Sequence, residues 1–242
     1  MRMEVLMSQP PASPILDSLR PRDRARLLDR AVPRRLVAGE RLYLTGDRRR
    51  RAHLVCSGVI KMTAHDNEGR ETILCLGLPG DIIGDVAALD GYPQPLDAVA
   101  AMRTTAYGFD ADLFVAILET NPSACLEQAR ALAQRARWIT DTALERTSSE
   151  VPARLAGRLL DLADLIGRVN NGAVELDVPL AQADLGRLAG MCRESANRAL
   201  KSFKEAGVVD YRGRRLRILR PDALERIRCE GRDRTLRART RR

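Results

Sequence analysis

The chain has 242 residues, a formal net charge of +9, 45% hydrophobic residues and only 3% aromatic ones. This length accommodates one large domain or two small ones, and the apolar content suffices for buried, mainly aliphatic cores. No apolar run approaches a membrane span and the N-terminus lacks the apolar core of a signal peptide, so we expect a cytoplasmic protein without a membrane partner. The five cysteines form no C-x-x-C pair, which excludes the usual zinc and iron–sulfur motifs.

The positive charge is concentrated at the C-terminal end. Residues 212–242 contain 13 arginines and four acidic residues, which accounts for the whole net charge, whereas residues 1–211 are neutral overall. A local excess of this kind indicates a polyanionic partner such as nucleic acid. The alternative is that the arginine content reflects only a GC-rich genome.

The first half of the chain predicts a tail, short helices and then many short strands. Residues 1–14 contain three prolines and no apolar period, which predicts a mobile tail. Residues 15–31 have inward-facing apolar positions on both sides of Pro21, which is typical of one or two short helices. Over residues 32–109, runs with β-branched residues alternate with Gly- and Asp-containing turns, and this pattern favours an antiparallel sandwich or barrel.

A long helix is predicted over residues 121–147. Asn121 suits the N-cap, and Pro122 suits the first helical position. Small and apolar residues recur in alternating steps of three and four, as in the seam between two helices. They are Leu126, Ala129, Leu132 with Ala133, Ala136, Thr140 and Ala143. A core helix within one chain is the alternative, but a helix of this length has too few partners beside a small β-domain, which favours a homodimer.

The following stretch predicts a second domain. Residues 148–169 have a strongly apolar helical face, and residues 170–172 form an Asn-Asn-Gly turn before a short strand over 174–180. Two short helices then meet at Gly190, where glycine suits the positive φ that ends a helix. The second of them starts from about Cys192 and has an apolar inner face, which consists of Ala196, Ala199, Leu200 and Phe203.

A basic hairpin and a tail complete the chain. The sequence GVVDYRGRRLRILR predicts a two-stranded wing that turns at residues 212–214. Pro221 begins a last short helix, PDALERIR. The residues from 229 onward are rich in arginine without an apolar period, and we expect a disordered tail that is attracted to phosphates.

The outer face of the second short helix has the residue types that bind base edges. Arg pairs with guanine, Asn with adenine and Glu with cytosine, and the candidates are Arg193, Glu194, Asn197 and Arg198. Lys201, Arg212 and Arg214 are candidates for contacts with the DNA backbone. A solvated helix face is the alternative, but the preceding helix at helix-turn-helix spacing and the basic hairpin that follows favour DNA binding.

The sequence RESANRALKSFKEAGVVD resembles the recognition helix and following turn of the cyclic-AMP receptor protein/FNR (CRP/FNR) family of bacterial transcription regulators. The segments AGERLYLTGD, SGVIKM, NEGRE and PGDIIGDVAALDG resemble the cyclic-nucleotide-binding β-roll of that family. The resemblance extends from residue 15 to residue 228 and implies an α+β fold. The implied order is a tail (1–14), an effector-binding-like β-roll (15–120), a dimerisation helix (121–147), a winged helix-turn-helix (148–228) and a basic tail (229–242).

The resemblance also implies a function. The family's R-E-x-x-x-R pattern matches Arg193, Glu194 and Arg198, which would read the G, C and G of a TGTGA-like half-site, while Gln182 would anchor a phosphate. The implied protein is a homodimer that binds double-stranded, palindromic DNA, responds to an effector or redox signal and works with RNA polymerase. The alternatives are a constitutive architectural DNA-binding protein with a vestigial pocket, or an enzyme that uses the β-roll pocket. No clustered His or Cys and no paired carboxylates support the enzyme, so no catalytic or metal-binding residue is assigned.

The effector pocket departs from the family pattern. Gly84 and Asp85 match the Gly-Glu pair that begins the family's phosphate-binding cassette, but the expected Arg-Ser falls near Leu96 and Asp97. An apolar and an acidic residue cannot pair with a phosphate. Thr140 keeps one of the two hydroxyls expected to contact adenine. Cyclic AMP is the ligand that the resemblance suggests, but the phosphate-binding arginine is absent and tight binding in the usual manner is not expected.

Two cysteines lie near predicted helix starts. Cys125 falls in the first turn of the long helix and Cys192 at the start of the recognition helix. Helix N-termini favour the thiolate, the reactive form of cysteine. Both residues are therefore candidates for redox or nitric-oxide sensing, and the alternative is that both are inert.

Overall fold

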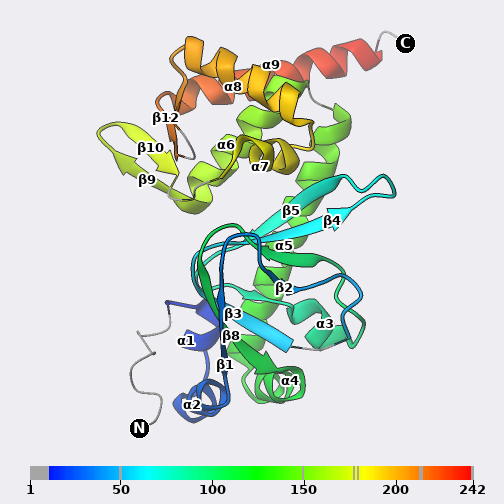
Figure 1. Cartoon of the computed structure of the whole chain (residues 1–242), viewed down its shortest axis with the longest axis vertical. Helices are drawn as coiled ribbons and strands as arrows, with labels where there is room; N and C mark the ends of the chain where they lie inside the picture. The colour runs from blue at the N-terminus through cyan, green and yellow to red at the C-terminus, as the bar shows by residue number, and fades with distance from the viewer. Residues whose placement is uncertain are drawn as a thin grey trace. The chain divides into compact units, whose positions relative to one another are not determined.

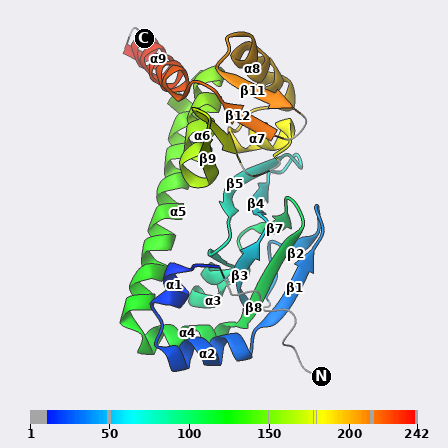
Figure 2. The same cartoon turned by 90° about the vertical axis from the view of Figure 1, so that its left-hand side faces the viewer.

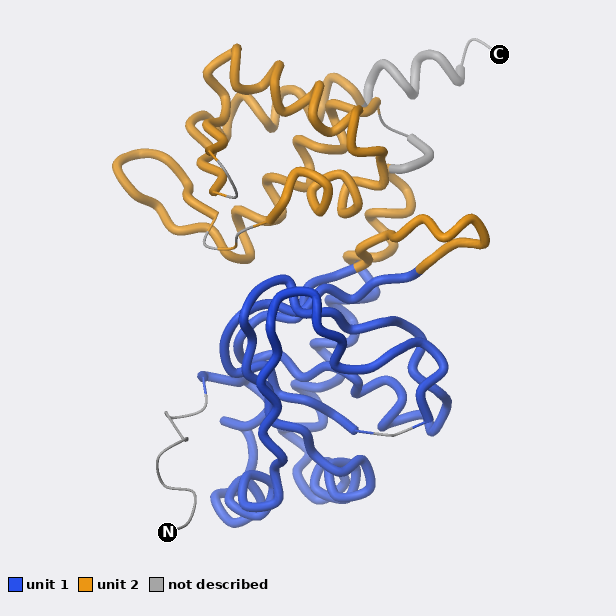
Figure 3. Tube along the Cα trace, viewed as in Figure 1, with its two compact units in different colours: residues 1–64, 75–137 blue, residues 65–74, 138–242 orange. Residues whose placement is uncertain are grey.

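The chain divides into two units, residues 1–64 with 75–137 and residues 65–74 with 138–242 (Figure 1; Figure 3). The computed structural model describes the backbone of residues 11–48, 51–148, 150–176, 178, 180–212 and 215–240, and the side chains of all of these except 146–148 and 232–240. Residues 1–10 of the predicted tail lie outside the described residues. The predicted tail of residues 1–14 extends too far toward the C-terminus. Ser13 is already buried, and its backbone N–H donates to the Asp17 carboxylate at 3.1 Å.

Two four-stranded sheets, with strand orders β1-β8-β3-β6 and β2-β7-β4-β5, form most of the first unit; residues 65 and 71–74 of β4 and β5 are counted with the second unit. The strands are β1 (Val32–Leu36), β2 (Arg41–Tyr43), β3 (Arg51–Ser57), β4 (Ile60–His65), β5 (Glu71–Gly77), β6 (Ile82–Ile83), β7 (Asp97–Ala100) and β8 (Thr104–Asp110). Neighbours such as β1 and β8, β3 and β8, and β4 and β7 are antiparallel. The antiparallel architecture predicted for residues 32–109 is confirmed.

Four helices accompany these sheets within the described residues of the first unit, apart from the long helix α5 (Figure 2). They are α1 (Pro14–Asp17), α2 (Pro21–Asp29), α3 (Asp85–Asp90) and α4 (Ala111–Thr120). The short helices predicted around Pro21 are confirmed. Leu16, Leu27 and Phe114 of α1, α2 and α4 join Leu54 and Phe109 of β3 and β8 in one buried apolar cluster. This cluster stabilises the unit by removing apolar surface from water.

Helix α5 (Pro122–Ser148) confirms the long helix predicted over residues 121–147. Asn121 does not cap it with its side chain as predicted. The Asn121 Oδ1 instead accepts the backbone N–H of Arg20 at 3.0 Å, and its Nδ2 donates to the Ile117 carbonyl at 2.8 Å. Asn121 therefore joins the end of α4 to the start of α2. The predicted seam is exposed in the single chain at Leu126, Ala129, Ala133, Ala136, Thr140 and Ala143.

The second unit combines helices with a small sheet. Its helices are α6 (Val151–Ile166), α7 (Gln182–Leu188), α8 (Arg193–Glu205) and α9 (Pro221–Thr240). Its strands are β9 (Gly167–Asn170), β10 (Ala173–Leu176), β11 (Val209–Arg212) and β12 (Arg215–Ile218), in the order β11-β12-β10-β9. The helix α6 packs against α7, α8 and α9. The predicted helix-turn-helix and the two-stranded wing are both present.

Two predictions in this unit are wrong. The helix predicted over residues 148–169 ends at Ile166, because residues 167–170 form β9 and pair with β10. Asn171 and Gly172 both have positive φ, of 49° and 76°, which suits a two-residue turn between antiparallel strands. The Asn-Gly pair therefore closes a hairpin whose first strand, β9, includes the last three residues of the predicted helix.

The C-terminal helix is also longer than predicted. The sequence predicts a disordered tail over residues 229–242, but α9 continues to Thr240, and residues 241–242 lie outside the described residues. A Cβ atom added at Gly231 would lie 2.3 Å from the Ala153 Cβ, so the glycine allows α9 to lie very close to α6. None of the helices in the described part of the chain combines the length and apolarity that crossing a bilayer requires.

Candidate nucleic-acid interface

The helices α7 and α8 are held together at close range. The buried Asp184 carboxylate accepts the backbone N–H of Ala181 at 3.2 Å and so satisfies an amide at the start of α7. A Cβ atom added at Gly186 would lie 3.2 Å from the Ala196 Cβ, which shows how closely the two helices approach. Gly190 has φ 62° and ends the first helix, as predicted. This arrangement is a helix-turn-helix.

The helix α8 separates an apolar face from a polar one. Ala196, Ala199, Leu200 and Phe203 are buried, as their 3.6-residue period predicts. Arg193, Glu194 and Arg198 are exposed on the other side, in the N-terminal half of the helix. In a helix-turn-helix protein this half of the second helix contacts base edges in the major groove. The structure therefore brings the three predicted base-reading residues together on one exposed surface.

Glu194 is held in its ionised form. The pKa of its carboxyl is lowered by a hydrogen bond from its own backbone N–H and by one from the Cys192 thiol. An ionised carboxylate only accepts hydrogen bonds. Glu194 thus has the chemistry needed to accept from the amino group of a cytosine.

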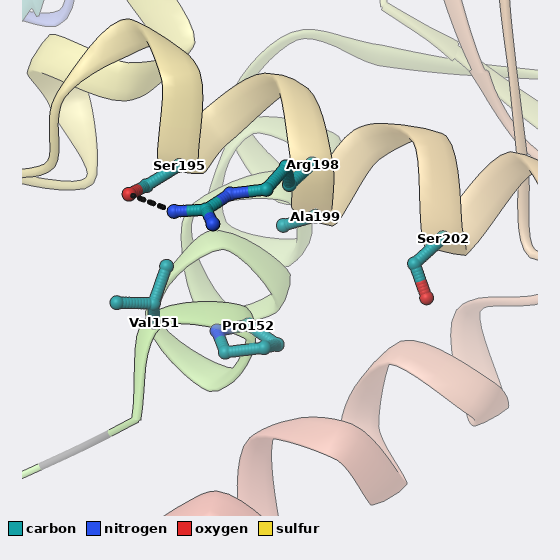
Figure 4. A pocket seen from close by; sticks show the side chains of 6 residues that line it. All are labelled: Val151, Pro152, Ser195, Arg198, Ala199 and Ser202. Carbon is teal, nitrogen blue, oxygen red and sulfur yellow. Dashed lines mark hydrogen bonds between the residues drawn. The ribbon is translucent and has the colours of Figure 1, made fainter.

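The Arg198 side chain lies along its own helix (Figure 4). Its guanidinium Nη2 donates to the Ser195 Oγ at 3.4 Å, a long hydrogen bond between exposed groups. The side chain borders a hollow of about 290 Å³, which is also lined by Val151 and Pro152 from the start of α6. Because its hydrogen bond to Ser195 is long and exposed, the Arg198 guanidinium can turn toward a base at little cost.

The other predicted DNA-contacting residues differ in exposure. Asn197 is half-buried, and its Oδ1 atom is buried without a hydrogen-bond partner among the described residues, so it is less accessible than Arg193 or Arg198. Gln182 is half-buried at the first position of α7. Lys201 is exposed, with its Nζ 3.8 Å from the Glu205 carboxylate.

The wing is fixed at the end of α8. The Tyr211 hydroxyl donates to the Leu180 carbonyl at 2.9 Å, and the Lys204 Nζ donates to the Tyr211 carbonyl at 3.3 Å. Arg212 is exposed and pairs with Asp210 at 3.1 Å. Arg214 lies outside the described residues. The sequence prediction did not name the residues that hold the wing in place, because a contact between Tyr211 and Leu180 has no local pattern.

The predicted effector pocket contains an internal ion pair. Asp85 is fully buried, and its carboxylate accepts from the Arg135 guanidinium of α5, with Nη1 at 2.9 Å from Oδ1, and from the Gln128 side chain. Gln94 donates to the Gly84 carbonyl at 3.3 Å. The sequence prediction missed Arg135 and Gln128. Their spacing of seven residues places them on one face of α5, a periodicity that would have suggested a shared partner.

The remaining predicted pocket residues have other roles. The Asp97 Oδ1 accepts the Thr45 backbone N–H at 2.7 Å, so this carboxylate holds the turn after β2. Leu96 is half-buried, and Thr140 is exposed on α5. Burial, followed by the charge of Asp85, raises the pKa of the Tyr43 hydroxyl, which therefore stays neutral. The sequence has no arginine next to Asp97 that could bind a phosphate, and Arg135 is already paired with Asp85.

The two candidate redox cysteines are both exposed and unbridged. Cys125 lies in the first turn of α5. Cys192 is the N-cap of α8, and its Sγ lies 3.2 Å from the Ser195 Oγ. A role of either thiol in sensing stays a prediction. In the described part of the chain, no three His, Cys, Asp or Glu side chains are placed to hold a metal ion.

The fold and the site together define a DNA-binding protein with a winged helix-turn-helix and a β-roll domain. The family model of the Crp-like helix-turn-helix domain matches residues 153–227, and that of the cyclic nucleotide-binding domain matches residues 33–121. The chain belongs to the CRP/FNR family and is a DNA-binding transcription regulator.

Individual relatives agree with this assignment. The chain is 26% identical to a CRP-like cAMP-activated global transcriptional regulator of Mycobacterium tuberculosis, over 88% of this chain and 95% of that protein. It is 28% identical to the cyclic AMP receptor protein of Thermus thermophilus, over 81% and 88% of the two chains. FixK2 from Bradyrhizobium japonicum has the same fold, with a TM-score of 0.73 and 20% identity over 81% of this chain and 96% of that chain.

Proposed function

We propose that the protein is a homodimer that binds palindromic DNA with TGTGA-like half-sites. The observation that carries this proposal is the exposure of Arg193, Glu194 and Arg198 on the N-terminal half of α8. The two arginines each supply a planar fork that fits guanine O6 and N7, and Glu194 accepts from cytosine N4. Lys201, Arg212 and Arg215 are exposed nearby in the sequence and supply contacts with phosphates.

The dimer is supported by the exposed stripe on α5. Six small or apolar positions of the predicted seam are accessible in the single chain, among them Leu126 and Ala133. A row of this kind along one helix is buried when two copies of the helix pair. Two recognition helices related by a two-fold axis read half-sites about one helical turn apart, roughly 34 Å.

The proposed regulator does not use cyclic AMP in the manner of relatives named as activated by it. Asp85 is neutralised by Arg135, and Asp97 stands near the position where the family resemblance leads us to expect a phosphate-binding arginine. An acidic residue repels the cyclic phosphate. The input is therefore a different effector or a redox signal at Cys125 or Cys192, and the output is exerted on RNA polymerase at the promoter.

DNA binding by the full chain tests the proposal. Fluorescence anisotropy is measured with a palindromic TGTGA-type duplex, a duplex with one half-site and a scrambled duplex, at a fixed salt concentration because phosphate contacts depend strongly on salt. Light scattering gives the oligomeric state. We expect a dimer that prefers the palindrome by about a thousandfold or more over scrambled DNA.

Each other outcome selects an alternative. Equal affinity for the palindrome and the scrambled duplex supports a constitutive architectural protein. A monomer, or equal affinity for the half-site and the palindrome, contradicts the dimeric mode of binding. Calorimetric detection of micromolar or tighter cyclic AMP binding overturns the exclusion of that ligand.

A further inference from the structure

An ion pair that is almost inaccessible to solvent joins α5 to α6. Arg158, in the middle of α6, is 2% exposed, and Glu145, near the end of α5, is 3% exposed. The Arg158 Nη2 donates to the Glu145 Oε2 at 2.5 Å. Charged side chains are rarely buried to this extent unless they are paired. The DNA-reading surface on α8 does not include either residue.

Further contacts of these two residues complete the Glu145–Arg158 cluster, which consists of Trp138, Thr142, Glu145, Arg158, Asp161 and Arg228. The Arg158 Nη1 donates to the Thr142 Oγ1 at 3.0 Å and lies 3.1 Å from the Asp161 carboxylate. The guanidinium carbon lies 4.8 Å from the centre of the Trp138 ring. Arg228 of α9 approaches the Glu145 Oε1 to 3.9 Å.

The cluster restricts the angle between two helices. A guanidinium is a planar fork with fixed donor directions, and here its donors bond to two residues one turn apart on α5. A Cβ atom added at Gly157 would lie 3.3 Å from the Glu145 Oε1, so α6 passes directly beside this carboxylate. Apolar side chains of similar volume would fill the same space without fixing a direction.

The orientation of α6 is passed on to the recognition helix. The helix α6 packs against both α7 and α8, and its first residues, Val151 and Pro152, line the same hollow as Arg198. Helix α5 is the proposed dimer helix. The cluster is therefore the link between the element that relates the two copies and the element that enters the major groove.

We propose that the Glu145–Arg158 cluster positions the recognition helix on the end of α5 and thereby sets the half-site spacing that the dimer accepts. This inference rests on the proposed function, because a spacing preference requires a dimer and a palindrome. Glu145 and Arg158 act through α6 and α8 and do not themselves touch DNA. Without the cluster, each recognition helix adopts a wider range of orientations and the dimer tolerates several spacings.

The experiment compares the wild-type chain with Glu145→Gln, with Arg158→Met and with the double variant Glu145→Met/Arg158→Met. The double variant removes both members of the buried pair and keeps the volume filled, whereas each single substitution leaves one of the two charges buried without the other. The Asp161 and Arg228 side chains, 23% and 27% exposed, stay in contact with water in this variant. The matched control is Arg226→Met, which removes an exposed arginine of α9 that pairs with Asp222 at 2.8 Å. Circular dichroism and light scattering check folding and dimer formation.

Affinity is measured for palindromes whose spacer is lengthened or shortened by one base pair, and for a duplex with one half-site. One base pair rotates a half-site by about 35°, so we expect the wild type and the control to prefer one spacer by about tenfold or more. We expect the double variant to lose most of this preference while its half-site affinity stays within about twofold of the wild type. Glu145→Gln should show the same trend at smaller amplitude.

The outcomes separate the two proposals. If the wild type shows no preference for a palindrome over one half-site, the proposed function fails. If the wild type has a spacing preference and the folded double variant keeps it, the positioning role is wrong. The positioning role is also wrong if the double variant loses affinity for the half-site and for the palindrome by the same factor. A residue that only stabilises the fold would reduce both affinities alike. If the double variant does not fold, the spacing profile of Glu145→Gln decides.

Discussion

The DNA-reading surface and the predicted effector pocket contain the same kinds of charged residue in opposite surroundings. On α8, Arg193, Glu194 and Arg198 are exposed. Their side chains are only weakly restrained; the hydrogen bond from Arg198 to Ser195, for example, is 3.4 Å long. In the first unit, Asp85 is fully buried and already bonded to Arg135 and Gln128. Charges that serve a partner stay in water until it arrives, whereas buried charges must be neutralised within the fold. The output of this regulator is therefore easier to predict than its input.

The largest expected effect tests the buried side of this comparison. Asp85→Ala leaves the Arg135 guanidinium largely buried without its counter-ion, and we expect it to lower the free energy of unfolding by about 2–4 kcal/mol. The measurement is urea unfolding followed by circular dichroism. Glu68→Ala, which breaks the exposed Arg70–Glu68 pair, is the control and should leave stability unchanged within error. Equal effects of the two substitutions would contradict the internal role of Asp85.

The next prediction concerns a buried histidine of the same unit. Burial, and then the charges of Arg34 and Arg51, lower the pKa of His53 from 6.5 to about 4. The unfolded chain therefore takes up a proton at higher pH than the folded chain, and the free energy of unfolding falls as the pH drops from 7 toward 4, by about 3 kcal/mol. His53→Gln should flatten this dependence in urea unfolding at several pH values. Parallel profiles of variant and wild type would refute the prediction.

Substitution of Arg198 tests the exposed side. Arg198→Ala removes one bidentate guanine contact, and we expect a loss of about 1–3 kcal/mol in discrimination between the palindrome and its mutated form. Stability should not change, since the side chain is exposed. Competition binding assays measure the ratio of the two affinities. Lys201→Ala is the comparison on the same helix, and it should weaken both duplexes alike. If Arg198→Ala also weakens both alike, Arg198 is not a base reader.

The smallest effect is expected at the wing. Arg215 is exposed at the start of β12, and Arg215→Ala should weaken binding of every DNA sequence by the same factor. The slope of log affinity against log salt should decrease by about 1 because one phosphate contact is lost. Arg26→Ala, on the exposed side of α2, changes the net charge equally and should leave the slope unchanged. A change in sequence preference would instead assign Arg215 to base reading.

Local sequence patterns predicted the elements whose residues share a short period. The helix α8 was predicted with its inner face because Ala196, Ala199, Leu200 and Phe203 repeat at helical spacing. The extent of α5 followed from Pro122 and from the regular steps of small residues. The helix α4 was not predicted, although the Asp110 Oδ1 caps it by accepting the backbone N–H groups of Asp112 and Leu113. The apolar residues of α4 are buried by contacts with distant parts of the chain, and only the tertiary structure shows these contacts.

The amino-acid sequence by itself determined the family, the order of the elements and the three residues proposed to read bases, because these depend on residue type and on short spacings. Only the tertiary structure decided that residues 167–170 are a strand, that α9 extends along α6, and that Arg135 neutralises Asp85. It alone placed Arg158 against Glu145. These features depend on contacts between residues far apart in the chain, and no local period encodes such contacts.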